Sequence, residues 1–408
     1  MTEIIFRIFG SLLFFLPGIL ASFIFFPRTT LLKRSVFSIA FSSSFITLLG
    51  MILVFFKKLK IYSIFLSLCS LSLFLLLFLI LKTKIKKEKL KTIFKKRSFF
   101  VVFFLSFLGA IWRLFLKIKF NLSGDAYTYV SYLIEKSIKE TGSLLIQVPH
   151  LNFYSGMVGG HAHYLGGTVV KIIWELIGLN FSFINIFLGV FLYLGFVYLT
   201  VFSLTKQKTL AYLATFLLSF GPVEIWKTTQ IFFGHPLSYI ALFSLFLFFL
   251  YPTYGYFFLA LFLSIAIILS YYTGAMVVMI VSGGFLIANI IFEFLKRKKI
   301  KKEIFLNKKN FLFLSVIFIS FLFVFLITNA NKYTQAHLKY IFYKTKNNLV
   351  SLSGGEFKEF QKKDSYLSSP MSLPFKNYHY TGPFKVFGLP LLAVEDFVFI
   401  SLLFLFIF

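Results

Sequence analysis

Residues 61–81, IYSIFLSLCSLSLFLLLFLIL, contain no charged side chain, and residues 82–97, KTKIKKEKLKTIFKKR, contain nine Lys and Arg. An apolar run of about 20 residues is long enough to cross, as a helix, a hydrocarbon core roughly 30 Å thick. A dense basic segment directly after such a run is typical of a cytoplasmic loop, because Lys and Arg are retained on that side of a membrane. These two segments therefore predict a membrane-spanning helix together with its orientation.

The composition of the whole chain agrees with this local pattern. Of the 408 residues, 59% are hydrophobic and only 14% are charged, against roughly 45–50% and about 25% in soluble domains. A soluble globular fold is therefore excluded, and the apolar runs lack the alternation of a transmembrane β-barrel. The single cysteine, Cys69, excludes an intrachain disulfide and a CxxC zinc framework. We predict an all-α polytopic membrane protein.

Apolar runs between charged segments predict eleven transmembrane helices, some of them short. They cover about residues 4–26, 35–56, 61–81, 98–116, 181–204, 209–222, 236–251, 256–272, 274–295, 311–328 and 389–408. We divide the chain into three parts. These are an N-terminal group of helices with its basic loop (1–97), a central module (98–295), and a C-terminal part with a second basic loop and the last two spans (296–408).

Two basic loops, residues 82–97 and 296–309, set the orientation of the predicted spans. Six spans lie between the loops, so both loops fall on the same side, together with the basic turns at 27–34 and 206–208. The KKLK segment at 57–60 falls on the opposite side and is the one local exception. About +20 of the formal charge of +28 then lies on the cytoplasmic side. Membrane topology thus explains most of the charge, and we expect no nucleic-acid partner.

Three polar segments are predicted on the external face: residues 117–180, 221–236 and 329–388. They contain all six histidines, which are His150, His161, His163, His235, His337 and His379. The predicted cytoplasmic loops carry little besides Lys. Any chemistry is therefore expected on the extracytoplasmic side of the cell (inner or plasma) membrane.

The first external segment contains two predicted amphipathic helices that lie beside the membrane. Helical spacing of apolar residues predicts the first over residues 126–140, with Asp125 as its N-cap. Asp125 either only caps this helix, where the helix dipole favours a carboxylate, or also meets a substrate at the membrane surface. The second helix carries Lys171, Trp174 and Glu175 and is not expected to span the membrane.

The residues between these helices include five glycines and two closely spaced histidines. His161 and His163 are either ligands or a proton shuttle, or ordinary interfacial histidines. The HxH spacing alone is a weak metal signal, because it fixes no third ligand.

The order of segments along the chain carries a family resemblance. A span is followed by GDAYTYVSYLIEKSIKETGSL (124–144), a stretch rich in Tyr, Gly and His, and a helix ending in ELIGL (175–179). Further spans follow, separated by TKQK (205–208) and SFGPVEIWKTTQIFFGHP (219–236). Over about residues 98–295 this order resembles the catalytic module of the GT-C superfamily of membrane glycosyltransferases. These enzymes use polyprenyl-phosphate sugars, and they include mannosyltransferase-like and aminoarabinose-transferase-like branches.

The resemblance implies an essential acidic residue at the start of the first juxtamembrane helix, and Asp125 alone matches it. The chain departs from the family in two details. Gly124-Asp125 replaces the frequent Asp-Glu pair, and GGHAHY (159–164) stands where a Pro-Pro is often found.

Combining the resemblance with the external residues gives a predicted site. The predicted catalytic residues are Asp125, Glu224 and His163, and the predicted substrate-binding residues are Arg113, Tyr127, His161, Lys227, His235 and Lys339. Asp125 and Glu224 offer carboxylate oxygens to Mg²⁺ or Mn²⁺, although not all branches of the superfamily need a metal. Glu224 alternatively pairs with Lys227.

The expected activity is inverting transfer of a hexosyl or pentosyl group from a polyprenyl-phosphate donor to a glycan, lipid or protein acceptor. Two alternatives stay open. An O-antigen ligase or polysaccharide polymerase would favour arginines in external loops, and after Arg113 this chain has only Arg297. A non-enzymatic lipid or solute transporter would carry ionisable residues or broken helices at mid-membrane depth.

Overall fold

The computed structural model describes residues 2–86, 91–93, 96–119, 165–179, 181–220, 235–270, 272–297 and 308–330. The helices and strands are α1 (Thr2–Phe25), β1 (Arg28–Thr30), α2 (Leu31–Phe55), α3 (Ile61–Lys86), β2 (Lys91–Ile93), α4 (Lys96–Lys119), α7 (Leu165–Ile177), α8 (Ser182–Thr205), α9 (Lys208–Ser219), α11 (His235–Leu250), α12 (Tyr254–Ser270), α13 (Tyr272–Arg297) and α15 (Lys308–Ala330). Ten of the predicted spans correspond to α-helices among these, and the span at 389–408 lies outside the described residues.

Within the described residues, five helices are long and apolar enough to cross a membrane. They are Glu3–Phe25, Leu31–Phe55, Ile61–Lys84, Lys96–Phe115 and Phe183–Thr205. The prediction of a helical membrane protein is therefore confirmed, whereas the count of eleven spans stays a prediction. Helix α9 has only 12 residues, and at about 1.5 Å per residue it is roughly 18 Å long, well short of a hydrocarbon core.

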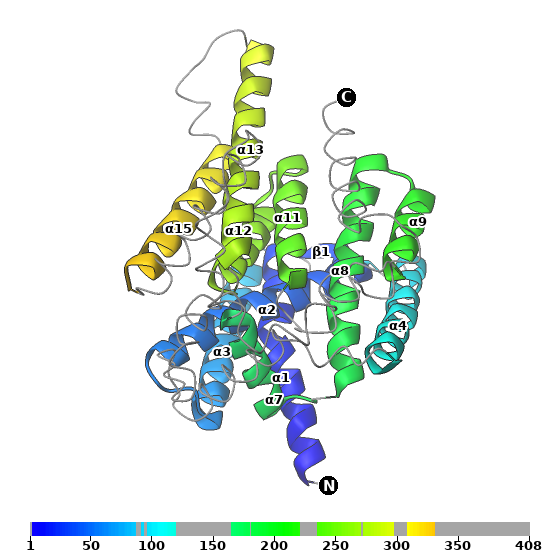
Figure 1. Ribbon diagram of the computed structural model, residues 1–408, viewed down its shortest axis with the longest axis vertical. Helices are drawn as coiled ribbons and strands as arrows, with labels where there is room; N and C mark the ends of the chain where they lie inside the picture. The colour runs from blue at the N-terminus through cyan, green and yellow to red at the C-terminus, as the bar shows by residue number, and fades with distance from the viewer. Residues whose placement is uncertain are drawn as a thin grey trace, which may run out of the picture.

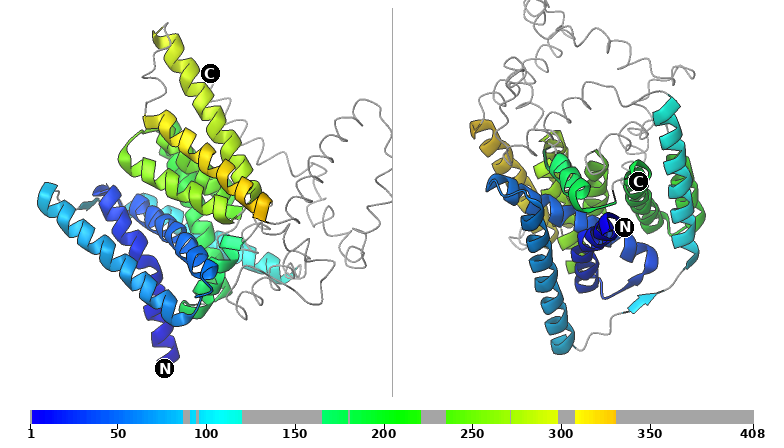
Figure 2. Two further views of the ribbon diagram at one scale, coloured as in Figure 1. Left: turned by 90° about the vertical axis from the view of Figure 1, so that its left-hand side faces the viewer. Right: turned by 90° about the horizontal axis from the view of Figure 1, so that it is seen from below.

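The described helices form three groups that meet at α2, and one of these groups is α8 with α4 and α9 packed against it (Figures 1 and 2). Helices α1 and α3 pack with α2 on one side, and α11, α12, α13 and α15 form the other group. In the apolar windows of α2 and α8, 67% and 78% of residues are buried, against 28% in α3 and in α4. Helices α2 and α8 are thus the inner helices, and the many exposed Phe and Leu side chains of α3 and α4 form the surface expected to face lipid.

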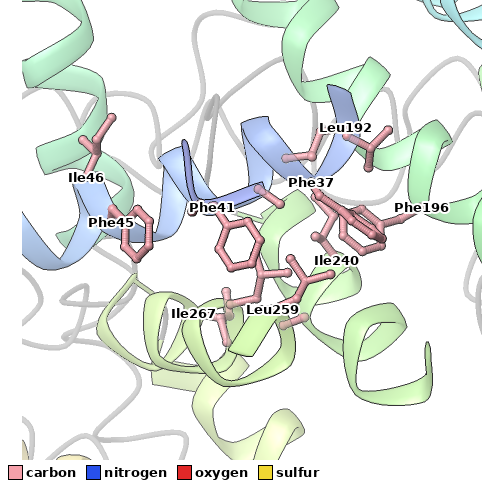
Figure 3. Packing of buried hydrophobic residues seen from close by; sticks show 14 of the residues in the cluster. Phe37, Phe41, Phe45, Ile46, Leu192, Phe196, Ile240, Leu259 and Ile267 are labelled. Atoms are coloured by element: carbon pink, nitrogen blue, oxygen red, sulfur yellow. The ribbon is translucent and has the colours of Figure 1, made fainter. Parts of the chain in front are cut away.

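The main hydrophobic core lies where one face of α2 meets α8, α11 and α12 (Figure 3). Phe37, Phe41 and Phe45 come from α2 and stand along this face. Buried residues of the facing helices complete the cluster: Leu192, Phe196, Ile240, Leu259 and Ile267. The aromatic spacing of four residues places all three Phe rings on a single side of α2.

Helices α1 and α2 are joined by close backbone contact and by serine hydrogen bonds. Pro17 interrupts the hydrogen-bond ladder of α1. At this turn the Ser42 hydroxyl of α2 donates to the Phe15 carbonyl (3.0 Å) and accepts from the Gly18 N–H (3.1 Å). A Cβ at Gly18 would clash with the Ser38 carbonyl oxygen, so glycine is what lets the two backbones approach.

The basic segments contain a structure that the sequence reading did not predict. Strand β1, between α1 and α2, pairs in parallel with β2 from the basic loop, and Arg28 lies opposite Lys91. The side chain of Thr30 then accepts from the Lys33 N–H (3.4 Å) and so caps the N-terminus of α2. The all-α class therefore has a two-stranded addition at one end of the helices.

Helix ends that the topology assigns to one side lie together in space. Lys33, in the first turn of α2, donates to the Tyr256 hydroxyl of α12 (3.2 Å), and Lys206, at the end of α8, donates to the Tyr251 hydroxyl beside α12. At the opposite end, Arg7 near the start of α1 donates to the carbonyl of Gly178 (3.0 Å) beyond α7. This grouping agrees with the predicted alternation of the helices, while the cytoplasmic identity of the first end stays a prediction.

We expect Gly18→Ala to lower the melting temperature of the purified protein in detergent by several degrees, because the added methyl group must push α1 away from α2. Gly284→Ala in α13 is the matched control, since a Cβ there meets no atom within 4 Å. Alanine favours a helix over glycine by roughly 1 kcal/mol, so the control should keep or slightly raise the melting temperature. Equal thermal shifts for the two variants would contradict the close packing at Gly18.

Candidate functional site

The C-terminal ends of α4 and α9 are held together by Arg113, a residue predicted to bind substrate. Its side chain is fully buried. The guanidinium group donates to the carbonyls of Gly109 (3.1 Å), Leu218 (3.2 Å) and Ser219. Gly109 permits this approach, because a Cβ there would lie 3.0 Å from the Ser219 carbonyl oxygen.

The end of α9 explains why an arginine is placed here. The last four carbonyls of any helix lack partners within that helix, and they carry the negative end of its dipole. In a buried, apolar position water cannot satisfy these carbonyls, so a cation with several N–H donors stabilises them. Arg113 of α4 therefore caps α9. The prediction that it also contacts a substrate phosphate stays a prediction.

Helix α7 is the second amphipathic helix that the sequence predicted, and it packs against α1, α2 and α12. Its buried Trp174 donates from Nε1 to Oδ1 of Asn185 on α8 (2.7 Å) and makes an edge contact with the Phe14 ring (4.8 Å between centroids). Lys171 and Glu175 form an ion pair on the less buried face (3.5 Å). Helix α7 is thus held in the bundle by contacts with α1, α2, α8 and α12.

The N-terminal part of α1 holds the end of α7, and the sequence reading missed this role. Arg7 donates to the carbonyls of Glu175 and Gly178 (3.0 Å each), and the Ser11 hydroxyl accepts from the Leu179 N–H (2.9 Å). The available signal was an arginine inside the apolar run 4–26, where an ionisable residue needs a partner. Arg7 therefore fixes the C-terminal end of α7, in the segment 117–180 that the sequence predicts to be external.

Most predicted site residues lie outside the described residues: Asp125, Tyr127, His161, His163, Glu224, Lys227 and Lys339. His235 is the first residue of α11. The grouping of Asp125, Glu224 and His163 thus stays a prediction, as does metal binding by the two acids. In the part of the chain that the structure describes, no group of three His, Cys, Asp or Glu residues could hold a metal ion.

The described helices nevertheless fix where the two segments with the candidate acids begin. Residues 120–164 follow α4, and residues 221–234 follow Phe220 after α9. Arg113 holds these two helix ends against each other. Asp125 follows Lys119 by six residues, and Glu224 follows Ser219 by five. The two segments that carry the candidate acids therefore begin at one corner of the bundle.

Comparisons with protein-family models, with curated proteins and with solved structures gave no match for this chain. A functional proposal therefore rests on the hydrogen bonds of Arg113 and on the order of the segments along the chain.

We expect Arg113→Met to lower the melting temperature by more than about 5 °C, because each buried carbonyl that loses its donor costs about 1–3 kcal/mol. Arg113→Lys should recover part of the loss, since one ammonium cannot reach all three carbonyls as a planar guanidinium does. The control is Arg97→Met, an exposed position near the other end of the same helix. Unchanged stability of Arg113→Met would refute the capping role.

Proposed function

We propose that this protein is an inverting membrane glycosyltransferase that moves a hexosyl or pentosyl group from a polyprenyl-phosphate donor to an acceptor hydroxyl outside the cell membrane. The proposal rests on one observation. The segments that carry Asp125 and Glu224 begin after α4 and α9, and Arg113 links these two helices. The GT-C-like order of segments over residues 98–295 supports it independently.

Chain length permits Asp125 and Glu224 to serve one site. A fully extended chain spans about 3.5 Å per residue, so the Cα of Asp125 lies within about 21 Å of that of Lys119. By the same limit, the Cα of Glu224 lies within about 18 Å of that of Ser219. Arg113, which contacts the Ser219 carbonyl, lies six residues before Lys119, so the two starting points are separated by about 9 Å along α4. Chain length therefore allows the two acids to reach one substrate.

In the proposed reaction, the Asp125 carboxylate accepts the proton of the acceptor hydroxyl as its oxygen attacks the anomeric carbon. The new glycosidic C–O bond forms on the face opposite the phosphate, and the bond from the anomeric carbon to the phosphate oxygen breaks. The polyprenyl phosphate leaves with that electron pair. One displacement inverts the anomeric centre and needs no covalent enzyme intermediate.

We assign the cations different roles in this reaction. Arg113 already donates to three carbonyls, so we propose that it is a positioning residue that keeps the two acidic segments together. The charge of the departing phosphate is then met by lysines such as Lys227 and Lys339, in two external segments. Cations placed where negative charge develops stabilise the transition state.

The donor set of Asp125 and Glu224 would suit Mg²⁺ or Mn²⁺, since these ions prefer carboxylate oxygens. Such an ion would supply positive charge to the donor phosphate. The mechanism above needs only the chain's own residues, and no step in it passes through a metal ion.

Transport is a second candidate function, favoured by one feature of the described bundle. Arg113 is fully buried within the candidate span Lys96–Phe115, beside the end of the short helix α9. Buried ionisable residues next to interrupted helices are typical of transporters. A transporter would move its solute without any change in glycosidic bonds, and this distinguishes the two proposals.

We expect Asp125→Asn to lower kcat/KM at least about 100-fold when transfer from a polyprenyl-phosphate sugar is measured with purified protein in liposomes, because amide nitrogen cannot accept the proton. The matched control is Glu135→Gln, an acid in the same predicted juxtamembrane helix, which should keep near wild-type transfer. Both variants should retain the wild-type melting temperature.

Wild-type transfer by Asp125→Asn would overturn the mechanism. Movement of a labelled lipid-linked sugar across the liposome membrane, with its glycosidic bond intact and no transfer in any protein, would favour transport instead.

A further inference from the structure

Two lysines and two tyrosines form a cluster at the end of the bundle opposite Arg113, where three helix turns meet. We call it the Lys33–Lys206 cluster, and its other members are Tyr251 and Tyr256. The tyrosine rings stack with 5.9 Å between their centroids. Lys33 lies over the Tyr256 ring (5.9 Å) and Lys206 lies over the Tyr251 ring (5.0 Å). Each ammonium group also donates to the hydroxyl of the tyrosine beneath it.

The electrostatic potential at this cluster is set by its two lysines. Lys33 and Tyr256 lie in the first turns of α2 and α12, and Lys206 caps the C-terminus of α8 two residues before α9. Each of the three turns joins a helix C-terminus to a helix N-terminus, so the opposite ends of the helix dipoles largely offset each other there. Among the described residues, neither Lys33 nor Lys206 forms an ion pair with a carboxylate.

The hydroxyl of Tyr251 lies close to both lysines. Burial raises the pKa of this hydroxyl, but hydrogen bonds with Lys206 and Ser203 and the charges of Lys206 and Lys33 lower it more, so the pKa lies below its usual value. Both lysines therefore act on a single hydroxyl, although they come from turns 173 positions apart in the chain. An anion at this hydroxyl would be attracted by both of them.

The position of the cluster at the ends of the candidate spans indicates which kind of anion it binds. Lys33 lies at the beginning of the candidate span Leu31–Phe55, and Lys206 follows the end of the span Phe183–Thr205. Residues at the ends of spans lie at the level of lipid headgroups. Lys206 is exposed there, whereas Tyr256 is buried and forms the floor of the cluster. A phosphate group offers several acceptor oxygens to ammonium and hydroxyl donors.

We propose that the Lys33–Lys206 cluster is a binding site for the phosphate of an anionic phospholipid headgroup. In it the two ammonium groups contact the phosphate oxygens, and the Tyr256 hydroxyl donates to an oxygen that the lysines leave open, while the Tyr251 hydroxyl keeps its hydrogen bond to the Ser203 carbonyl (3.4 Å). The lipid would join the α1–α2, α8–α9 and α11–α12 turns, which are far apart in the chain. The site is separate from the proposed transferase site, because it lies at the other end of the helices.

The test uses the full chain, delipidated in a neutral detergent, and titrates it with short-chain phosphatidylglycerol, phosphatidylcholine or inorganic phosphate. Binding is counted by native mass spectrometry, and stabilisation is followed by the melting temperature. The variant is Lys206→Gln. Its control is Lys57→Gln, another exposed lysine in the left-handed backbone conformation (φ 55° at Lys57, 57° at Lys206), located after α2 at the opposite end.

We expect phosphatidylglycerol to bind wild-type protein and Lys57→Gln equally and to bind Lys206→Gln about fivefold more weakly, since each lysine near a headgroup contributes about 1 kcal/mol. Tyr256→Phe, which removes only the hydroxyl, should weaken binding less. Equal affinity of Lys206→Gln and Lys57→Gln would overturn the site. Equal stabilisation by phosphatidylcholine would overturn its preference for anionic lipid, and equal stabilisation by inorganic phosphate would overturn the lipid assignment.

Discussion

The carbonyl groups at the C-terminal ends of helices need donors, and in an apolar surrounding water does not supply them. Three of the described helices end against a cation from another helix. Arg34 and Lys82 donate to carbonyls in the last turn of α1, Arg7 to carbonyls at the end of α7, and Arg113 to those of α9. Three of the six arginines thus replace water at helix ends. Each such contact joins two helices, and the contacts of Arg7, Lys82 and Arg113 join helices that are distant in the chain.

Apolar runs were sufficient to predict ten helices in nearly the right places, because a span must bury its backbone within itself. The runs could not reveal which helices lie inside the bundle. Phe41 of α2 is buried, whereas Phe74 of α3 is exposed, and both come from apolar helices long enough to cross a membrane. In lipid a phenylalanine is stable on either side of a helix. The inner position of α2 instead depends on Ser38, Ser42 and the glycine of α1 that faces them, and these small residues carry little weight in a hydropathy reading.

For the candidate site, the sequence indicated one of the two arginines that hold helix ends, Arg113, and did not indicate the other, Arg7. Arg113, inside the predicted span 98–116, was predicted to bind substrate, and the structure gives it a definite set of partners. Two of these partners are carbonyls of α9, which no sequence pattern predicts, because the contact is made across 105 positions of chain. Arg7 was overlooked for the same reason. The predicted site residues Asp125, Glu224, His161 and His163 lie outside the described residues, and their chemistry rests on the proposal.

The parallel pairing of β1 with β2 has a consequence for how the protein is inserted into its membrane. Residues 28–30 and 91–93 can pair only when they lie on one side of the bilayer, and crossing by both α2 and α3, which separate them, returns the chain to that side. A hairpin in which only one of these helices crossed would leave the two strands in different compartments. The ladder is therefore incompatible with insertion of one of the two helices alone.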